Sequence, residues 1–111
     1  MKDESRAHLY DMLQAIRSIK AFVSGRTFAE YTSDELLRSG VERKLAIIGE
    51  ALSRLRRDEP DLLSQIRSQR DIISFRNILV HGYDTIDDRI VWGVVEADLD
   101  NMIEDVEKLL R

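Results

Sequence analysis

The sequence predicts an all-α protein, a four- to five-helix up-and-down bundle. Apolar residues recur every three or four positions over long stretches, which is the spacing of amphipathic helices. One proline and five glycines leave few points where helices must end, and strand-favouring residues never alternate for long. A chain of 111 residues is the size of one domain, so residues 1–111 are expected to form a single domain.

The first helix is predicted over residues 3–24 and is ended by Gly25. A connector of sequence RTFAEY follows, and Thr32 with Glu35 forms a capping-box pattern that would open a short helix through Leu37. The face that the first helix buries is predicted by its apolar stripe, which consists of Leu9, Met12, Leu13, Ile16, Ile19 and Val23.

The second long helix is predicted over residues 40–58, because Pro60 disfavours helical geometry in the residue before it. A short amphipathic turn, DLLSQIRSQ, separates it from a third helix over residues 70–81. That third helix is apolar on nearly all sides, which indicates a central, well-buried position. Gly82 follows it, as a left-handed C-terminal cap would.

The last helix is predicted to run to the C-terminus, with either Asp87 alone or Thr85 together with Asp88 as its N-terminal cap. Bundles of this size often leave one apolar stripe exposed and bury it by dimerising, so a homodimer is expected.

Composition narrows the classes of function. The 17 basic and 21 acidic residues give a net charge of −4, which argues against a protein that coats nucleic acid through bulk charge. The chain has no cysteine, and its acidic residues form no convincing metal-ligand set, so neither a metal nor another cofactor is expected. No apolar run approaches the roughly 20 residues of a membrane span, and the start lacks an apolar signal core, so a cytoplasmic protein without membrane contact is expected.

The candidate chemistry centres on the end of the third helix. His81 precedes Gly82, and Asn77, four residues earlier, shares its helix face and could orient the imidazole. Arg76 lies five residues before His81, about 140° away around an ideal helix, so the two groups converge poorly within one chain. A two-fold axis could bring the arginine of one chain to the histidine of its partner. His8, among charged residues near the start, is expected to be an exposed, solvated side chain.

These residue types suit RNA cleavage. Histidine can remove the proton of a 2′-hydroxyl and protonate the leaving oxygen, while arginine offers paired donors to phosphate oxygens. On spacing alone a structural interpretation remains open, in which Arg76 is a surface residue and His81 binds the last carbonyls of its helix.

A longer stretch, SFRNILVHGYDTID, contains the pattern R-x-x-x-x-H-x-Y, with Arg76, His81 and Tyr83 at its three fixed positions. A second stretch, VERKLAIIGEAL over residues 41–52, has Gly49, Glu50 and Ala51 at the positions they occupy in the second helix of the family that carries this pattern. Together they resemble the HepT-like toxins of the HEPN superfamily, and the resemblance spans nearly the whole chain.

The resemblance implies an HEPN bundle, a homodimer and a metal-independent endoribonuclease toxin of a type VII-like toxin–antitoxin system. It also implies a partner, a minimal nucleotidyltransferase antitoxin that transfers AMP from ATP to Tyr83. Such a modification would add bulk and negative charge beside His81 and Arg76, where an RNA phosphate has to sit.

Three questions stay open in the sequence. Glu50 could orient Arg76, or it could pair with Arg54 four residues on. The chain could also be a non-catalytic dimeric module that binds nucleotide or a nucleotidyltransferase. Finally, several arginines could guide RNA to the site or could balance acidic residues on helix surfaces. The second role is favoured for most of them, the set being Arg43, Arg54, Arg57, Arg67 and Arg70.

Overall fold

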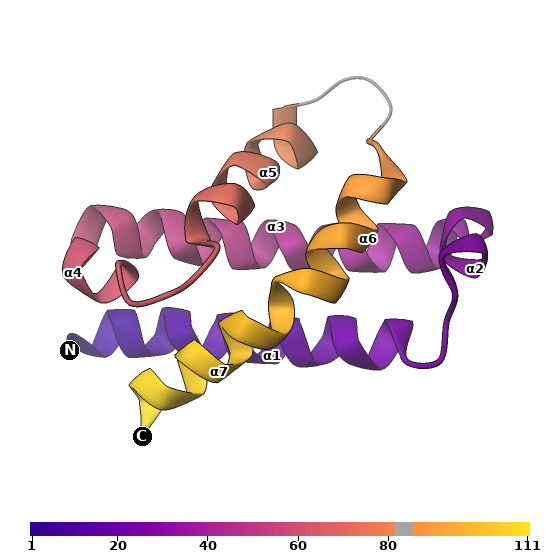
Figure 1. The fold of residues 1–111 in the computed structure, drawn as a ribbon. Coiled ribbons are helices and arrows are strands. Elements are labelled where there is room, and N and C mark those ends of the chain that lie inside the picture. The colour runs from indigo at the N-terminus through magenta and orange to yellow at the C-terminus, as the bar shows by residue number, and fades with distance from the viewer. Residues whose placement is uncertain (82–85) are drawn as a thin grey trace.

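The computed structural model describes residues 1–81 and 86–111, with side chains for residues 1–77 and 86–111. The two longest helices, α1 (Asp3–Val23) and α3 (Glu35–Asp58), lie side by side and antiparallel (Figure 1). Helix α5 (Gln69–His81) leans on α3, while α6 (Asp88–Ala97) and α7 (Leu99–Leu110) cross over the α1–α3 pair. Two short helices, α2 (Phe28–Ser33) and α4 (Pro60–Leu63), connect the long ones. The predicted all-α class is confirmed.

The core lies between α1 and α3, which pack against each other more extensively than any other pair. The predicted stripe of α1 is buried, except that Val23 is partly exposed. Helix α3 contributes five apolar side chains to this core, all with no exposed surface: Val41, Leu45, Ile48, Leu52 and Leu55. Each such side chain contributes about 1.5–3 kcal/mol relative to an exposed one, so this seam carries much of the stability.

The segment between α1 and α3 differs from the prediction. The capping box is formed by Thr27 and Glu30, whose side chains each accept a hydrogen bond from the other's backbone N–H at 3.1 Å. The predicted connector RTFAEY therefore starts a helix, and the prediction of a box at Thr32 was wrong. Asp34 caps α3 by accepting from the Leu37 N–H at 3.0 Å, so α3 begins earlier than residue 40.

The C-terminal helix is bent into two. Asp87 accepts a hydrogen bond from the Arg89 N–H at 2.9 Å, which confirms Asp87 as the N-terminal cap of α6, whereas Thr85 of the alternative cap lies outside the described residues. The predicted single helix ends at Ala97 and resumes at Leu99. At the bend, Asp98 accepts a hydrogen bond from the Ser68 hydroxyl at 3.2 Å, and Ser68 itself has a left-handed φ of 64°. This contact ties the bend to the turn that precedes α5.

Helix α5 presents Ile72, Ile73 and Phe75 to the core, while Ser74 and Asn77 are exposed. The described part of its sequence is therefore amphipathic, and the predicted apolar surface at residues 78–80 and the predicted cap at Gly82 lie outside the described side chains and residues.

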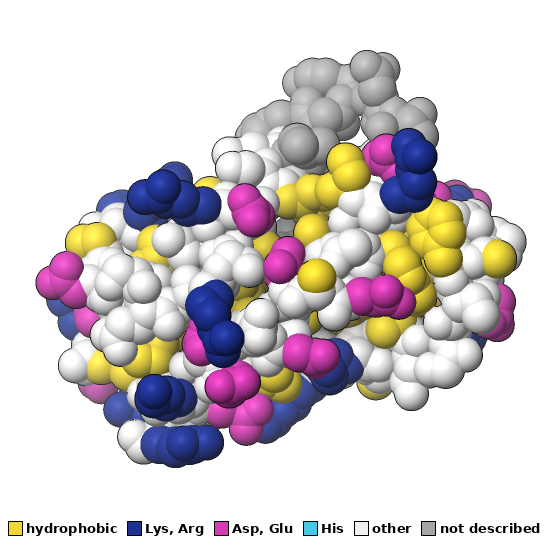
Figure 2. Space-filling model, in the orientation of Figure 1, with side chains coloured by type: hydrophobic (Ala, Val, Ile, Leu, Met, Phe, Trp, Pro, Cys, Tyr) yellow, Lys and Arg dark blue, Asp and Glu magenta, His cyan; other side chains and the backbone are white. Residues whose placement is uncertain are grey.

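On the face crossed by α6 and α7, basic and acidic side chains are mixed with one another. Apolar side chains gather where α6 lies beside α2 (Figure 2). Among the described residues, no helix is both long enough and apolar enough to cross a membrane.

Candidate functional site

The site begins with an unusually close approach of two helices. A Cβ atom on Gly49 of α3 would lie 2.3 Å from Cβ and 2.7 Å from Cγ of Arg76 on α5, and 3.3 Å from the Ile72 carbonyl oxygen. Ordinary carbon contacts begin at about 3.4 Å, so only glycine lets α5 approach α3 this closely. Gly49 therefore sets the position of the Arg76 side chain.

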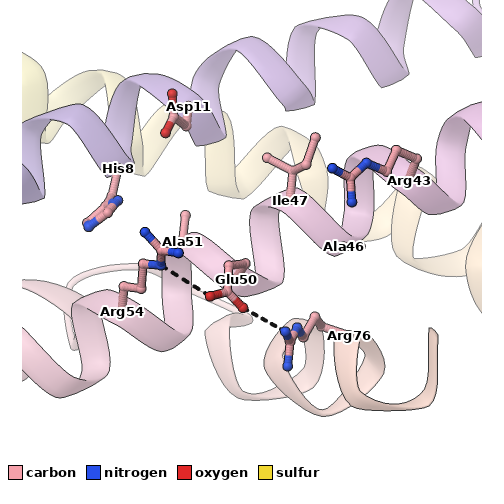
Figure 3. Close-up of a pocket in the computed structure, with 9 residues that line it drawn as sticks. All are labelled: His8, Asp11, Arg43, Ala46, Ile47, Glu50, Ala51, Arg54 and Arg76. Atoms are coloured by element: carbon pink, nitrogen blue, oxygen red, sulfur yellow. Dashed lines mark hydrogen bonds and ion pairs between the residues drawn. The ribbon is translucent and has the colours of Figure 1, made fainter. Parts of the chain in front are cut away.

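The Arg76 guanidinium is held by Glu50, the residue after Gly49. Nη2 of Arg76 lies 2.7 Å from Oε2 of Glu50, and the Arg76 side chain is 24% exposed. The other carboxylate oxygen of Glu50 accepts a hydrogen bond from Nε of Arg54 at 3.1 Å. Figure 3 shows Glu50 between the two arginines. Glu50 thus makes both of the contacts that the sequence left open.

Arg76 keeps hydrogen-bonding capacity in reserve. Its Nε is buried and has no hydrogen-bond partner among the described residues. Nη1 makes only a long contact of 3.4 Å with Oδ1 of Asn77, whose side chain is exposed. A guanidinium has five N–H donors in a planar fork, and within the described residues only Glu50 and Asn77 contact its terminal nitrogens.

A cavity of about 360 Å³ opens beside this ion pair, between α1, α3 and α5. Its apolar surface comes from Ala46, Ile47 and Ala51 of α3 (Figure 3). Its charged lining consists of three arginines and two carboxylates, a formal charge of +1, contributed by Arg43, Arg54, Arg76, Asp11 and Glu50. The cavity is locally cationic in a chain whose net charge is −4.

His8 also lines this cavity, and this is the residue that sequence reasoning missed. It was expected to be fully solvated, but it is half-buried on α1 and extends toward α3 on the Arg54 side (Figure 3). Position 8 borders the buried stripe of α1 beside Leu9. The sequence held that signal, but only the pairing of α1 with α3 decides what His8 faces.

The family follows from comparison with known proteins. Residues 12–109 match the family model described as "Ribonuclease HepT-like". The chain belongs to the HepT-like ribonuclease family. Its all-α arrangement is that of the HEPN type, as the resemblance implied.

Relatives in archaea cover almost the same length as this HepT-like chain. It is 31% identical to the "Probable ribonuclease HepT" of Thermococcus cleftensis, over 100% of both chains. It is also 31% identical to a Methanocaldococcus jannaschii protein named "Putative RNase", over 99% of this chain and 90% of the relative. No solved structure gives a significant match.

The structure places only part of the HepT-like motif. Arg76, Asn77 and Glu50 are brought together, and α5 continues as a helix through His81. The His81 side chain and all of Tyr83 lie outside the described part of the chain. Within the described residues, no three His, Cys, Asp or Glu side chains are grouped to hold a metal ion.

Arg67 and two aromatic residues outside the cavity make structural contacts. Arg67 pairs with Asp105 at 3.0 Å, and this guanidinium lowers the pKa of the Asp105 carboxyl. Trp92 packs on the buried Tyr31, with ring centroids 5.3 Å apart, and burial raises the pKa of the Tyr31 hydroxyl. Burial, followed by the charge of Asp88, also raises the pKa of Glu42, and none of these groups lines the cavity.

Proposed function

We propose that this chain is a metal-independent endoribonuclease toxin whose single-domain bundle uses Arg76 and His81 as its catalytic residues. The observation that carries the proposal is Arg76 itself. It is fixed across Gly49, paired with Glu50 as its one carboxylate partner within the described residues, and placed at the edge of a cationic cavity. This is the arrangement expected of a residue that binds a phosphate rather than one that stabilises a helix surface.

The proposed reaction needs only side chains. His81 accepts the proton of the RNA 2′-hydroxyl, and the 2′-oxygen then forms a bond to the adjacent phosphorus. The bond from phosphorus to the 5′-oxygen breaks, and that oxygen takes up the proton that His81 accepted, which leaves a 2′,3′-cyclic phosphate, a 5′-hydroxyl and a neutral imidazole. Arg76 stabilises the charge that builds on the phosphate oxygens. Asn77 orients the imidazole, and Glu50 orients Arg76.

We propose that two chains complete each site. Positions 76 and 81 are about 140° apart around one helix, so a homodimer lets Arg76 of one protomer act with His81 of the other. Mixing inactive Arg76→Ala and His81→Ala proteins tests this arrangement. A composite site predicts that exchange of subunits restores part of the activity, whereas sites within single chains predict that the mixture stays inactive.

The toxin would be controlled by a minimal nucleotidyltransferase antitoxin in the cytoplasm. That partner would transfer AMP from ATP to the Tyr83 hydroxyl with release of pyrophosphate, and the added phosphate would repel an RNA phosphate at the same place. Co-expression with the neighbouring nucleotidyltransferase, if one is encoded there, tests this part. Mass spectrometry should then find one AMP group on the wild type and none on Tyr83→Phe.

The ribonuclease proposal is tested by incubating purified protein with RNA. The wild type should cut, while Arg76→Ala and His81→Ala should not, although circular dichroism should show each variant as helical as the wild type. Arg56→Ala is the matched control, because Arg56 is an exposed arginine of α3 that does not line the cavity. A wild type that binds nucleotide or a nucleotidyltransferase tightly yet cuts no RNA would establish the non-catalytic module instead.

A further inference from the structure

One face of α3 carries a line of residues that runs past the Arg76–Glu50 pair. They are separated by four, three and four positions, so they lie on the same side of the helix. The first and last are eleven positions apart, which places them about 16 Å from each other along the axis and within about 20° around it. In order, the line consists of Arg43, Ile47, Glu50 and Arg54.

The neighbouring helices make this line the floor of a groove. Helix α1 supplies His8 and Asp11 along one side, and α5 supplies Arg76 along the other (Figure 3). The groove therefore extends in both directions from the guanidinium proposed to hold the reacting phosphate.

The arginines of the groove are poorly neutralised compared with others in the chain. Within the described residues, no carboxylate lies at ion-pair distance from Arg43. Arg54 and Arg76 share the single carboxylate of Glu50. Arg67, by contrast, has both Asp105 and Glu104 to itself.

We propose that this groove binds single-stranded RNA, with Arg43 and Arg54 contacting phosphates on either side of the one at Arg76. His8 donates a hydrogen bond to the phosphate nearest Arg54. A cationic groove that follows the backbone is the usual way to hold a single strand, and the apolar surface around Ile47 suits sugars and bases. The inference deepens the proposed ribonuclease function and rests on it.

The test measures binding without cleavage. A fluorescently labelled 2′-O-methyl RNA single strand cannot be cut by 2′-hydroxyl attack, so its affinity is independent of catalysis. Arg43→Gln and Arg54→Gln should each weaken binding roughly tenfold at low salt. Each should also reduce the slope of log affinity against log salt by about 0.7, the value for one lost phosphate contact on a single strand. His8→Ala should weaken binding several-fold and raise KM for a cleavable RNA.

Arg56→Gln is the control, since it removes the same charge from the opposite side of α3 and should leave the affinity unchanged. Binding by Arg43→Gln and Arg54→Gln that equals that of Arg56→Gln would overturn the inference. The inference would also be overturned if Arg43→Gln or Arg54→Gln changed the mass of the assembly and left the RNA affinity unchanged, because the groove would then be an interface between copies of the chain. If the wild type cuts RNA while these variants bind normally, only the groove is refuted. If the variants lose binding but the wild type cuts nothing, only the ribonuclease is refuted.

Discussion

Replacement of Gly49 by alanine tests how the site is assembled, because it adds one methyl group at the closest approach of α3 and α5. The new Cβ would lie 2.3 Å from the Arg76 Cβ, about 1.1 Å short of the 3.4 Å at which ordinary contact begins. The atoms that it would meet, Cβ and Cγ of Arg76, lie next to the backbone of α5, so a change of side-chain rotamer cannot relieve the overlap. Helix α5, and Arg76 with it, must move by about that distance.

Two opposing effects set the expected stability. Overpacking of this kind costs about 1–3 kcal/mol, while alanine is about 1 kcal/mol better than glycine within a helix. The difference is about 0–2 kcal/mol, so we expect Gly49→Ala to lower the free energy of unfolding by up to about 2 kcal/mol, and Tm by up to roughly 8 °C for a chain of this size. Thermal unfolding followed by circular dichroism measures the change.

The matched control is Gly93→Ala in α6, where an added Cβ meets nothing within 4 Å and the position is exposed. The same substitution should there raise stability by up to about 1 kcal/mol. Cleavage measured below both melting temperatures should fall about a hundredfold for Gly49→Ala, since misplacing a catalytic group by 1 Å has effects of that order. A Gly49→Ala protein as stable and as active as Gly93→Ala would refute the argument.

Three further substitutions probe the contacts around the site and the fold. Glu50→Ala should lower the rate of cleavage at saturating RNA far more than it lowers Tm, because the half-exposed carboxylate orients Arg76 but adds little stability; an unchanged rate would contradict that role. Thr27→Ala should cost about 1 kcal/mol in chemical denaturation by removing the capping box, and an unchanged midpoint would contradict that role. Arg67 lowers the pKa of Asp105 in the folded chain, so this carboxylate stabilises the fold above its unfolded pKa and loses the effect as the pH falls through its folded pKa. Asp105→Asn should therefore lower Tm at neutral pH, and the difference from wild type should vanish in acid rather than persist.

Local signals predicted the long elements well, and failed where two signals competed. Pro60 and Asp87 influence only the few residues next to them in the chain. As predicted, α3 ends just before Pro60 and α6 begins just after Asp87. Two segments fit the capping-box pattern, Thr27-Phe-Ala-Glu30 and Thr32-Ser-Asp-Glu35. The neighbouring sequence does not indicate which of the two forms the box. Gly40 lies inside α3, where an added Cβ would lie 3.4 Å from the ring of Phe22, so a glycine that suggested a boundary instead faces a side chain of α1.

The candidate site shows the same division. The sequence offered Glu50 as a partner for Arg76 because both stand in stretches that resemble one family. It could not give the contact of Gly49 with Arg76, or the presence of His8 in the cavity, since both depend on how α1, α3 and α5 pack over long separations in the chain. Such tertiary contacts have no periodic signature in a single sequence.

The most direct test of the account is the chemistry of the cut end. A DNA strand with one ribonucleotide should be incubated with the purified protein in excess EDTA, beside the same strand with 2′-deoxyribose at that position. The account predicts a single cut after the ribonucleotide, a 2′,3′-cyclic phosphate on the product by mass spectrometry, and an intact all-deoxy strand. A cut in the all-deoxy strand, or loss of all activity in EDTA that returns with a divalent cation, would contradict it.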